Sequence, residues 1–254
     1  FIRIVPTYYF LTTFYILLLI LFPDISKLSS NFQMDFTILK SYLFISEWFG
    51  HSPLLHVGWS IEYEIYFYLI FSFSILLRNL IKEYYLTFML IIIFYLIFDL
   101  DLFILEFCLG ILVFILTKHY RINKTISMLI FFTGILIFVT NFEKTHNLDR
   151  FFRYGIPSFL IVLGSINLRE YKFNFFKLLG DASYSIYLIQ VFTTSFIFKI
   201  INLFSVKGYE LIYFTLNIIF TVIVGLIFYI IFEKKILNYK KFITNQNKKN
   251  PRSV

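Results

Sequence analysis

Two carboxylates lie inside a long apolar run of this sequence, at Glu62 and Glu64. The run covers 53–77, about 25 residues, and at about 1.5 Å per helical residue Glu64 lies roughly 16 Å from its start, near the middle of a bilayer. A charged group at that depth costs at least about 3 kcal/mol on insertion scales, so an ionisable residue there indicates a functional site. Such a carboxylate takes up protons, pairs with a cation or orients another catalytic group.

Helical geometry separates the two carboxylates. Residues four apart share a face, so His56, Ser60, Glu64 and Tyr68 are expected to form one stripe, whereas Glu62 points roughly 200° away. We therefore expect one of the two carboxylates to face a second cavity, a neighbouring helix or a cation. Either can instead be a polar contact that holds two helices together. His56, two turns from Glu64, is a weaker candidate for a base.

Three stretches of the sequence carry a resemblance to a known family. Residues 59–68 fit the pattern W-S-x-x-x-E-x-x-F-Y, residues 3–8 fit R-I-x-P-x-Y, and residues 179–188 fit L-G-x-x-S-Y-S-x-Y-L. With these motifs in this order, the chain resembles membrane-bound acyltransferase family 3, the bacterial O-acyltransferases of surface polysaccharides and related acceptors. Three motifs in family order are more specific than any one aromatic run.

The resemblance implies two sets of site residues. The candidate catalytic residues are Glu64, Ser60 and Trp59. The candidate substrate-binding residues are Arg3, Tyr68, Ser183, Tyr184 and Tyr187. In this scheme the Glu64 carboxylate orients or pairs with a catalytic His or Arg, and Arg3 meets the phosphates of a substrate. The alternatives are that Arg3 extends to the membrane interface and that the hydroxyl groups of 183–187 bond across helices.

The resemblance also implies the reaction. An acyl group, usually acetyl, passes from cytoplasmic acyl-CoA to a hydroxyl of a cell-surface glycan or lipid-linked sugar, which requires a base for the hydroxyl proton and a donor for the oxyanion. Acyl-CoA is then a co-substrate, and no bound cofactor or metal is expected. The basic loops 118–124 and 169–177 suit CoA phosphates, although positive-inside topology predicts the same residues and no Gly-rich phosphate loop is present.

Two features depart from the family pattern. Gln190 stands where the family often has a His after the third motif. Because a Gln cannot titrate, an acid–base function at this position is absent or is carried by another residue. The chain begins with Phe1 at its R-I-x-P-x-Y element, and the family carries an essential His in a helix before that element. We therefore expect an N-terminally truncated member, in which this His is not part of the sequence.

The elements that position these residues are predicted to be membrane helices. The chain is 59% hydrophobic and 22% aromatic, with a mean hydropathy of +0.79, which is typical of polytopic membrane proteins. We predict an all-α integral membrane helical bundle with about eight transmembrane helices. The candidate spans are 4–23, 53–77, 84–99, 102–117, 126–142, 154–168, 182–204 and 210–232. The expected domains are a transmembrane acyltransferase domain, 1–233, and a basic cytoplasmic tail, 234–254.

Charge distribution predicts the orientation. With the start of the chain inside, most of the 23 Lys and Arg residues fall on the cytoplasmic side, so both termini of this chain are predicted cytoplasmic in the bacterial inner membrane. Topology also explains the net charge of +8, and we expect no nucleic acid partner. Segment 24–52 is then the longest outer loop, which either helps bind an acceptor sugar or simply connects two spans. The expected partners are membrane lipids and the acceptor; the oligomeric state stays open.

Two further residues inside apolar runs have ordinary interpretations. Cys108 is the sole cysteine, so no disulfide forms within the chain, and core packing is its expected role. Glu106 lies near one end of a short span, where a helix-end or interhelical polar contact is the expected role.

Two other classes of membrane protein compete with the transferase. In a glycan flippase or transporter, Glu62, Glu64 and Glu106 would form a proton or substrate path, but the internal repeat typical of transporters is missing. In a repeat-unit polymerase an arginine-rich outer loop is expected, and 24–52 has no Arg. A purely structural membrane protein leaves Glu64 unexplained.

Overall fold

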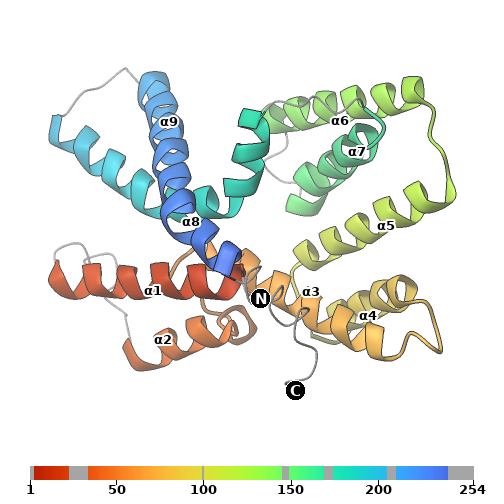
Figure 1. The fold of residues 1–254 in the computed structure, drawn as a ribbon, viewed down its shortest axis with the longest axis horizontal. Coiled ribbons are helices and arrows are strands. Elements are labelled where there is room, and N and C mark those ends of the chain that lie inside the picture. Colours follow the sequence, from red (N-terminus) through yellow and green to blue (C-terminus); the bar gives the residue numbers. More distant parts are fainter. Residues whose placement is uncertain are drawn as a thin grey trace. The chain divides into compact units, whose positions relative to one another are not determined.

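The computed structural model describes residues 3–22, 34–98, 100–144, 149–168, 174–204 and 210–239 (Figure 1). Every regular element among them is helical, which confirms the all-α prediction. The α-helices are α1 (Ile4–Leu21), α2 (Met34–Leu43), α3 (Gly58–Leu76), α4 (Glu83–Phe98), α5 (Leu105–His119), α6 (Lys124–Lys144), α7 (Ile156–Ser165), α8 (Asn174–Phe204) and α9 (Glu210–Phe228). Short 3-10 and π-helical turns add η2 (Glu47–Phe49), η3 (Leu102–Ile104), η4 (Phe151–Gly155) and η5 (Tyr229–Glu233).

Each predicted span is occupied by a helix in the described part of the chain. Four helices are long and apolar enough to cross a membrane, and three shorter ones are also apolar. The four are Ile4–Leu21, Leu102–His119, Asn174–Ile201 and Leu211–Tyr239. The three are Glu83–Phe98, Lys124–Thr140 and Phe151–Ser165. The remaining predicted span, 53–77, holds α3, which is more polar because it carries both carboxylates and several Tyr and Ser. Helices are stable in the apolar core of a membrane because their backbone N–H and C=O groups are hydrogen-bonded within the helix.

Part of the predicted outer loop 24–52 is helical, because residues 34–43 form α2 and residues 47–49 form η2. α2 runs antiparallel along α1, where Tyr9 Oη donates to the Tyr42 carbonyl at 2.6 Å and the Tyr42 and Thr13 hydroxyls lie 2.6 Å apart (Figure 1). Phe44 then packs its ring 5.0 Å from that of Tyr8. α2 has ten residues, too few to span a membrane, so the lengths of the apolar runs do not predict it. The chain therefore returns along α1 before α3 begins.

The chain divides into two compact units, each described here by itself: residues 1–62 with 172–254, and residues 63–171. In the first unit α8 and α9 pack closely, because a Cβ at Gly225 would lie 2.6 Å from a side-chain atom of Ile186. The hydroxyls of Thr193 and Thr221 lie 2.7 Å apart across the same pair of helices. Small residues let membrane helices approach closely, and hydrogen bonds between hydroxyl groups stabilise their packing.

The second unit contains the pair α6 and α7. A Cβ at Gly164 would lie 2.5 Å from the Phe131 backbone nitrogen and 2.7 Å from the Ser127 carbonyl oxygen. A Cβ at Gly134 would lie 2.9 Å from the Ile161 nitrogen. Both glycines are therefore required for the backbones to approach this closely.

Substitution of Gly164 by Ala is expected to lower the stability of the protein by about 1–3 kcal/mol, because the added methyl overlaps backbone atoms that cannot move aside. Thermal unfolding in detergent measures the effect. The matched control is Gly110→Ala on α5, where nothing lies within 4 Å of the added Cβ and helix propensity improves. Equal unfolding temperatures for the two variants would refute the proposed close packing.

Candidate active site

The first and third sequence motifs meet the start of the second motif, residues 59–62, in the first unit, on one face of α8. Tyr184 Oη donates to the Ile4 carbonyl at 2.9 Å, and Tyr187 Oη donates to the Val57 carbonyl at 2.8 Å. Ser60 Oγ lies 2.6 Å from Tyr187 Oη. Because Tyr184 and Tyr187 are three residues apart, one helical face reaches both α1 and the start of α3. Segments far apart in the sequence are thus joined at the positions that the motifs specify.

Arg3, just before α1, is held by residues of α8 and η5 in the first unit. Its Nε lies 2.6 Å from Glu233 Oε1, and its Nη2 donates to the Asp181 carbonyl at 2.7 Å. The second Glu233 oxygen accepts a hydrogen bond from Ser185. The Glu233 side chain is 1% exposed and that of Arg3 is 41% exposed, so the guanidinium neutralises a buried carboxylate and still reaches the surface. Charge-assisted hydrogen bonds are stronger than neutral ones, and they hold the Arg3 guanidinium in a defined orientation.

Glu233 and Ser185 are site residues that sequence reasoning missed. The sequence marks Glu233 only as the last residue of the predicted membrane domain, and its pairing with Arg3 joins residues 230 positions apart. Within the third motif, Ser183 is exposed on α8 whereas Ser185 is buried. A substrate role for Ser183 stays a prediction, and the motif's buried hydroxyl is that of Ser185.

The signature helix α3 carries Ser60, Glu64 and Tyr68 on one stripe. Tyr68 Oη donates to Glu64 Oε1 at 2.7 Å, which confirms the expected four-residue spacing. The expectation that His56 continues this stripe is wrong, because the helix begins at Gly58 and His56 is an exposed turn residue before it. No cationic side chain of the described residues forms an ion pair with Glu64.

Trp59 occupies the first turn of α3 and is half-buried. Its backbone N–H donates to the His56 carbonyl at 3.4 Å. The catalytic roles assigned to Trp59, Ser60 and Glu64 stay predictions, as do the binding roles of Arg3 and Tyr68.

Glu62 faces a different environment from Glu64, as the helical spacing predicts. Its side chain is fully buried, and its Oε2 accepts the Glu47 backbone N–H at 2.9 Å. The neighbour is the 3-10 helix η2, which the sequence did not predict. Glu62 therefore holds the segment that returns along α1.

Four buried polar atoms near Glu62 make no hydrogen bond of good geometry among the described residues, although Thr12 faces Tyr8 and Ser46 faces Glu62: Tyr8 Oη, Thr12 Oγ1, Ser46 Oγ and Glu62 Oε1. They belong to one region, since a Cβ at Gly58, one turn before Glu62, would lie 2.7 Å from Tyr8 Oη. Buried polar groups are normally paired. Small rotations of the hydroxyls would pair these groups with one another, and a bound water would satisfy them equally well.

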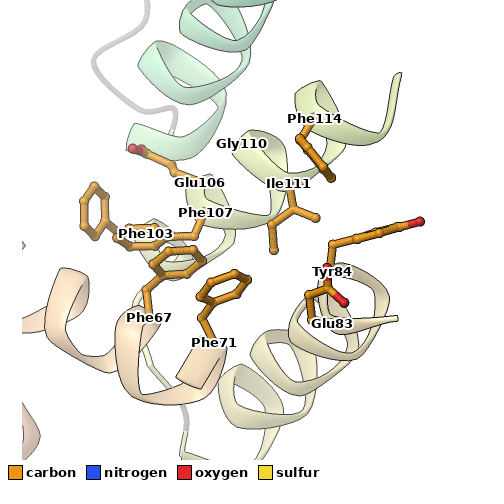
Figure 2. Close-up of a pocket in the computed structure, with 10 residues that line it drawn as sticks. All are labelled: Phe67, Phe71, Glu83, Tyr84, Phe103, Glu106, Phe107, Gly110, Ile111 and Phe114. Atoms are coloured by element: carbon orange, nitrogen blue, oxygen red, sulfur yellow. The ribbon is translucent and has the colours of Figure 1, made fainter. Parts of the chain in front are cut away.

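The second unit contains a cavity of about 490 Å³ (Figure 2). Its walls come from the C-terminal half of α3, from the start of α4, and from η3 with α5. They are Phe67, Phe71, Glu83, Tyr84, Phe103, Glu106, Phe107, Gly110, Ile111 and Phe114. Phe67 belongs to the signature of α3, and its ring is stacked on that of Phe107 at 4.9 Å. Part of the signature helix therefore forms the wall of a largely aromatic cavity.

Glu106 lies at one end of this cavity, in the first turn of α5. Arg150 Nε is 3.5 Å from Glu106 Oε1, and the Arg150 guanidinium lies 4.5 Å from the Phe103 ring centroid. This agrees with the expected interhelical polar contact of Glu106, because Arg150 precedes η4.

Comparison with known families agrees with the motifs. A family model described as an acyltransferase domain, that of acyltransferase family 3, matches residues 1–232. Neither the curated proteins nor the solved structures gave a match. The match covers most of the chain, including all three motifs, and four of the described helices are long and apolar enough to cross a membrane. The chain therefore belongs to acyltransferase family 3 and is a membrane acyltransferase.

Proposed function

We propose that this protein is an O-acyltransferase that moves an acyl group, in the simplest case acetyl, from cytoplasmic acyl-CoA to a hydroxyl of a cell-surface glycan or lipid-linked sugar. The observation that carries the proposal is that α8, with the third motif, contacts Ile4 of the first motif and Ser60 at the start of the second. Such an arrangement brings a cation, several hydroxyls and the start of the Glu64 helix to one region, as acyl transfer between two bound substrates requires.

The transfer breaks the thioester C–S bond and forms an ester C–O bond. The acceptor hydroxyl loses its proton to a base, and the proton finally reaches the departing CoA sulfur, so that one ester and one thiol are formed. Glu64 orients or charge-pairs with the base, and the Tyr68 hydrogen bond holds the Glu64 carboxylate in one rotamer. A donor role of Ser60 toward the oxyanion requires its hydroxyl to turn away from Tyr187 Oη, and Trp59 is assigned beside it on the motif alone.

The proposed donor side is the end of the first unit that contains Arg3. The exposed part of the Arg3 guanidinium suits a phosphate of CoA, while Glu233 and the Asp181 carbonyl hold it in place. Tyr184 and Tyr187 bond to backbone carbonyls, so we assign them to shaping the substrate path, with Ser183 exposed beside them.

The proposed location is the bacterial inner membrane, with both termini of this chain cytoplasmic. Two observations support it. Most Lys and Arg fall on that side in the predicted topology. The contact between Arg3 and Glu233 means that the start of α1 and the end of η5 lie at the same end of the first unit.

NMR of the surface glycan from cells with and without the intact gene tests this function. We expect O-acyl signals to disappear from an otherwise unchanged polymer in the deletion strain, and to return on complementation. A shortened or missing polymer would instead favour the polymerase or transporter. Unchanged O-acyl signals would exclude a glycan acceptor.

A further inference from the structure

α1 gives a measure of depth in the first unit. It has 18 residues and is long and apolar enough to cross a membrane. Arg3, whose side chain is 41% exposed, precedes the first residue of α1, and a charged side chain at a helix end reaches the membrane surface. At about 1.5 Å per residue, positions 8 and 13 lie roughly 6 Å and 14 Å from Ile4 along the helix axis. Groups that contact α1 at these positions therefore lie inside the apolar layer of the membrane.

α2 brings the chain to this depth from the opposite end of α1. The two helices run antiparallel and side by side (Figure 1). Near the end of α2, Tyr42 contacts both Tyr9 and Thr13, so the chain has reached the middle of α1. The exposed side chains of α2 suit lipid rather than water, since three of them are large and apolar: Phe36 (67% exposed), Leu39 (55%) and Leu43 (55%). α2 therefore lies within the membrane and ends there.

Residues 44–57 remain at this depth, and most of them are not helical. The short 3-10 helix η2 is followed by irregular chain until α3 begins. The stretch is fixed from two sides: the Leu54 backbone N–H donates to Ser41 Oγ of α2 at 2.8 Å, and the Glu47 backbone N–H donates to Glu62 Oε2 of α3 at 2.9 Å. The chain is thus held between α2 and α3 and does not return to the membrane surface.

α3 also begins inside the membrane. A Cβ at Gly58, the first residue of α3, would lie 2.7 Å from Tyr8 Oη, so α3 starts beside the second turn of α1. The Val57 carbonyl accepts the Tyr187 hydroxyl, roughly 9 Å along α8 from the carbonyl that holds Arg3. Both contacts place the beginning of α3 deeper in the membrane than Arg3.

Irregular backbone at this depth requires a particular environment. Within a membrane it is tolerated only where it is buried in protein or lines a water-filled cavity. One side of the stretch is buried, at Leu55 and Val57. The other side, which we call the polar side, is exposed and carries His51, Ser52 and His56. Because histidines within membrane segments face the protein interior or a water-filled cavity rather than lipid, the polar side is expected to face water.

We propose that residues 44–57 form a re-entrant segment whose polar side lines a water-filled cavity. The acceptor hydroxyl reaches Ser60 through this cavity, from the membrane side opposite Arg3. Ser60 Oγ lies 3.2 Å from the Val57 carbonyl, at the inner end of the segment. The ring of Trp48, 45% exposed, adds an apolar face against which a sugar ring can pack. The identity of the acceptor rests on the proposed function, whereas the cavity rests on the fold alone.

Cysteine labelling in spheroplasts tests the cavity. The protein carries Cys108→Ala, which removes the sole cysteine of this sequence, and single cysteines are added as His51→Cys or Ser52→Cys. A small charged methanethiosulfonate reacts with thiolates in water, whereas a maleimide on a long polyethylene glycol chain reaches only thiols outside the membrane. The matched control is Phe10→Cys, which lies at the same depth on the apolar helix α1 and replaces a side chain that is 45% exposed.

We expect the small reagent to label His51→Cys and Ser52→Cys several-fold faster than Phe10→Cys, because a thiol that faces lipid does not ionise. The large reagent should label none of the three until SDS dissolves the membrane. Equal labelling of the polar side by both reagents would show an ordinary outer loop and would overturn the proposal. A lack of reaction with the small reagent at both polar-side positions would show a segment sealed in protein, which also overturns it.

Kinetics test the acceptor route. Isolated membranes receive isotope-labelled acetyl-CoA and surface glycan from the deletion strain. Attachment of the charged reagent to His51→Cys is expected to raise the KM for the glycan several-fold and to leave the KM for acetyl-CoA unchanged, because only the acceptor passes this segment. Equal changes in both KM values, or no change in either, would overturn the acceptor route. Absence of transfer before the reagent is added would count against the proposed function, and the labelling pattern alone would then decide whether the cavity exists.

Discussion

Replacement of Glu64 by Gln is expected to reduce acyl transfer by at least about 100-fold while the protein still inserts into the membrane, because Gln keeps the shape of the side chain but cannot carry charge. The amide oxygen of Gln can still accept the Tyr68 hydrogen bond, so the fold around residue 64 should be retained. Acyl incorporation into the acceptor, normalised to protein in the membrane fraction, is the measurement.

Glu62→Gln is the matched comparison, two residues away on the same helix. Because Glu62 Oε2 accepts the Glu47 N–H, the amide can preserve this contact and the expected loss of transfer is much smaller than at residue 64. Normal transfer by well-expressed Glu64→Gln would remove Glu64 from the mechanism. If only Glu62→Gln abolished transfer, the catalytic carboxylate would be Glu62.

Removal of the Arg3 charge by Arg3→Gln is expected to destabilise the protein by roughly 2–3 kcal/mol. Breaking a buried ion pair costs about 3–5 kcal/mol and an exposed pair at most about 1 kcal/mol, and this pair joins a buried Glu233 to a half-exposed Arg3. The loss should therefore lie between these limits, because among the described residues Ser185 would be the remaining hydrogen-bond partner of the buried Glu233 carboxylate. Unfolding in detergent measures it.

The double variant Arg3→Gln with Glu233→Gln distinguishes the ion pair from simple packing. Since the second change removes the uncompensated buried charge, the double variant should be more stable than Arg3→Gln alone. Strictly additive losses would show that the two side chains do not interact. If Arg3 also binds CoA phosphates, the double variant should recover stability without recovering transfer.

The local features of this fold were predictable because they depend on short-range spacing. The apolar runs predicted the helices, and the four-residue spacing predicted both the Glu64–Tyr68 contact and the separate environment of Glu62. The predicted span 53–77 begins earlier than α3, since the run of apolar residues starts before the turn that leads into Gly58. This difference is why the prediction that His56 continues the stripe is wrong.

The long-range features were not predictable from the sequence alone. The pairing of Arg3 with Glu233 joins the two ends of the first unit, and no local pattern specifies it. The choice of Ser185 over Ser183 depends on which face of α8 packs near Glu233, which tertiary structure decides. The family motifs indicated which segments matter, while the contacts between them required the fold.

Transfer from isotope-labelled acetyl-CoA in isolated membranes tests the central claim most directly. Membranes that contain the wild-type protein and its native acceptor are predicted to incorporate the label as an ester that mild base releases, and membranes with Glu64→Gln are predicted to stay near background. Incorporation at the same level in membranes from the deletion strain, or none with the wild-type protein in the presence of acceptor, would contradict the assignment of this chain as an acetyl-CoA-dependent O-acyltransferase.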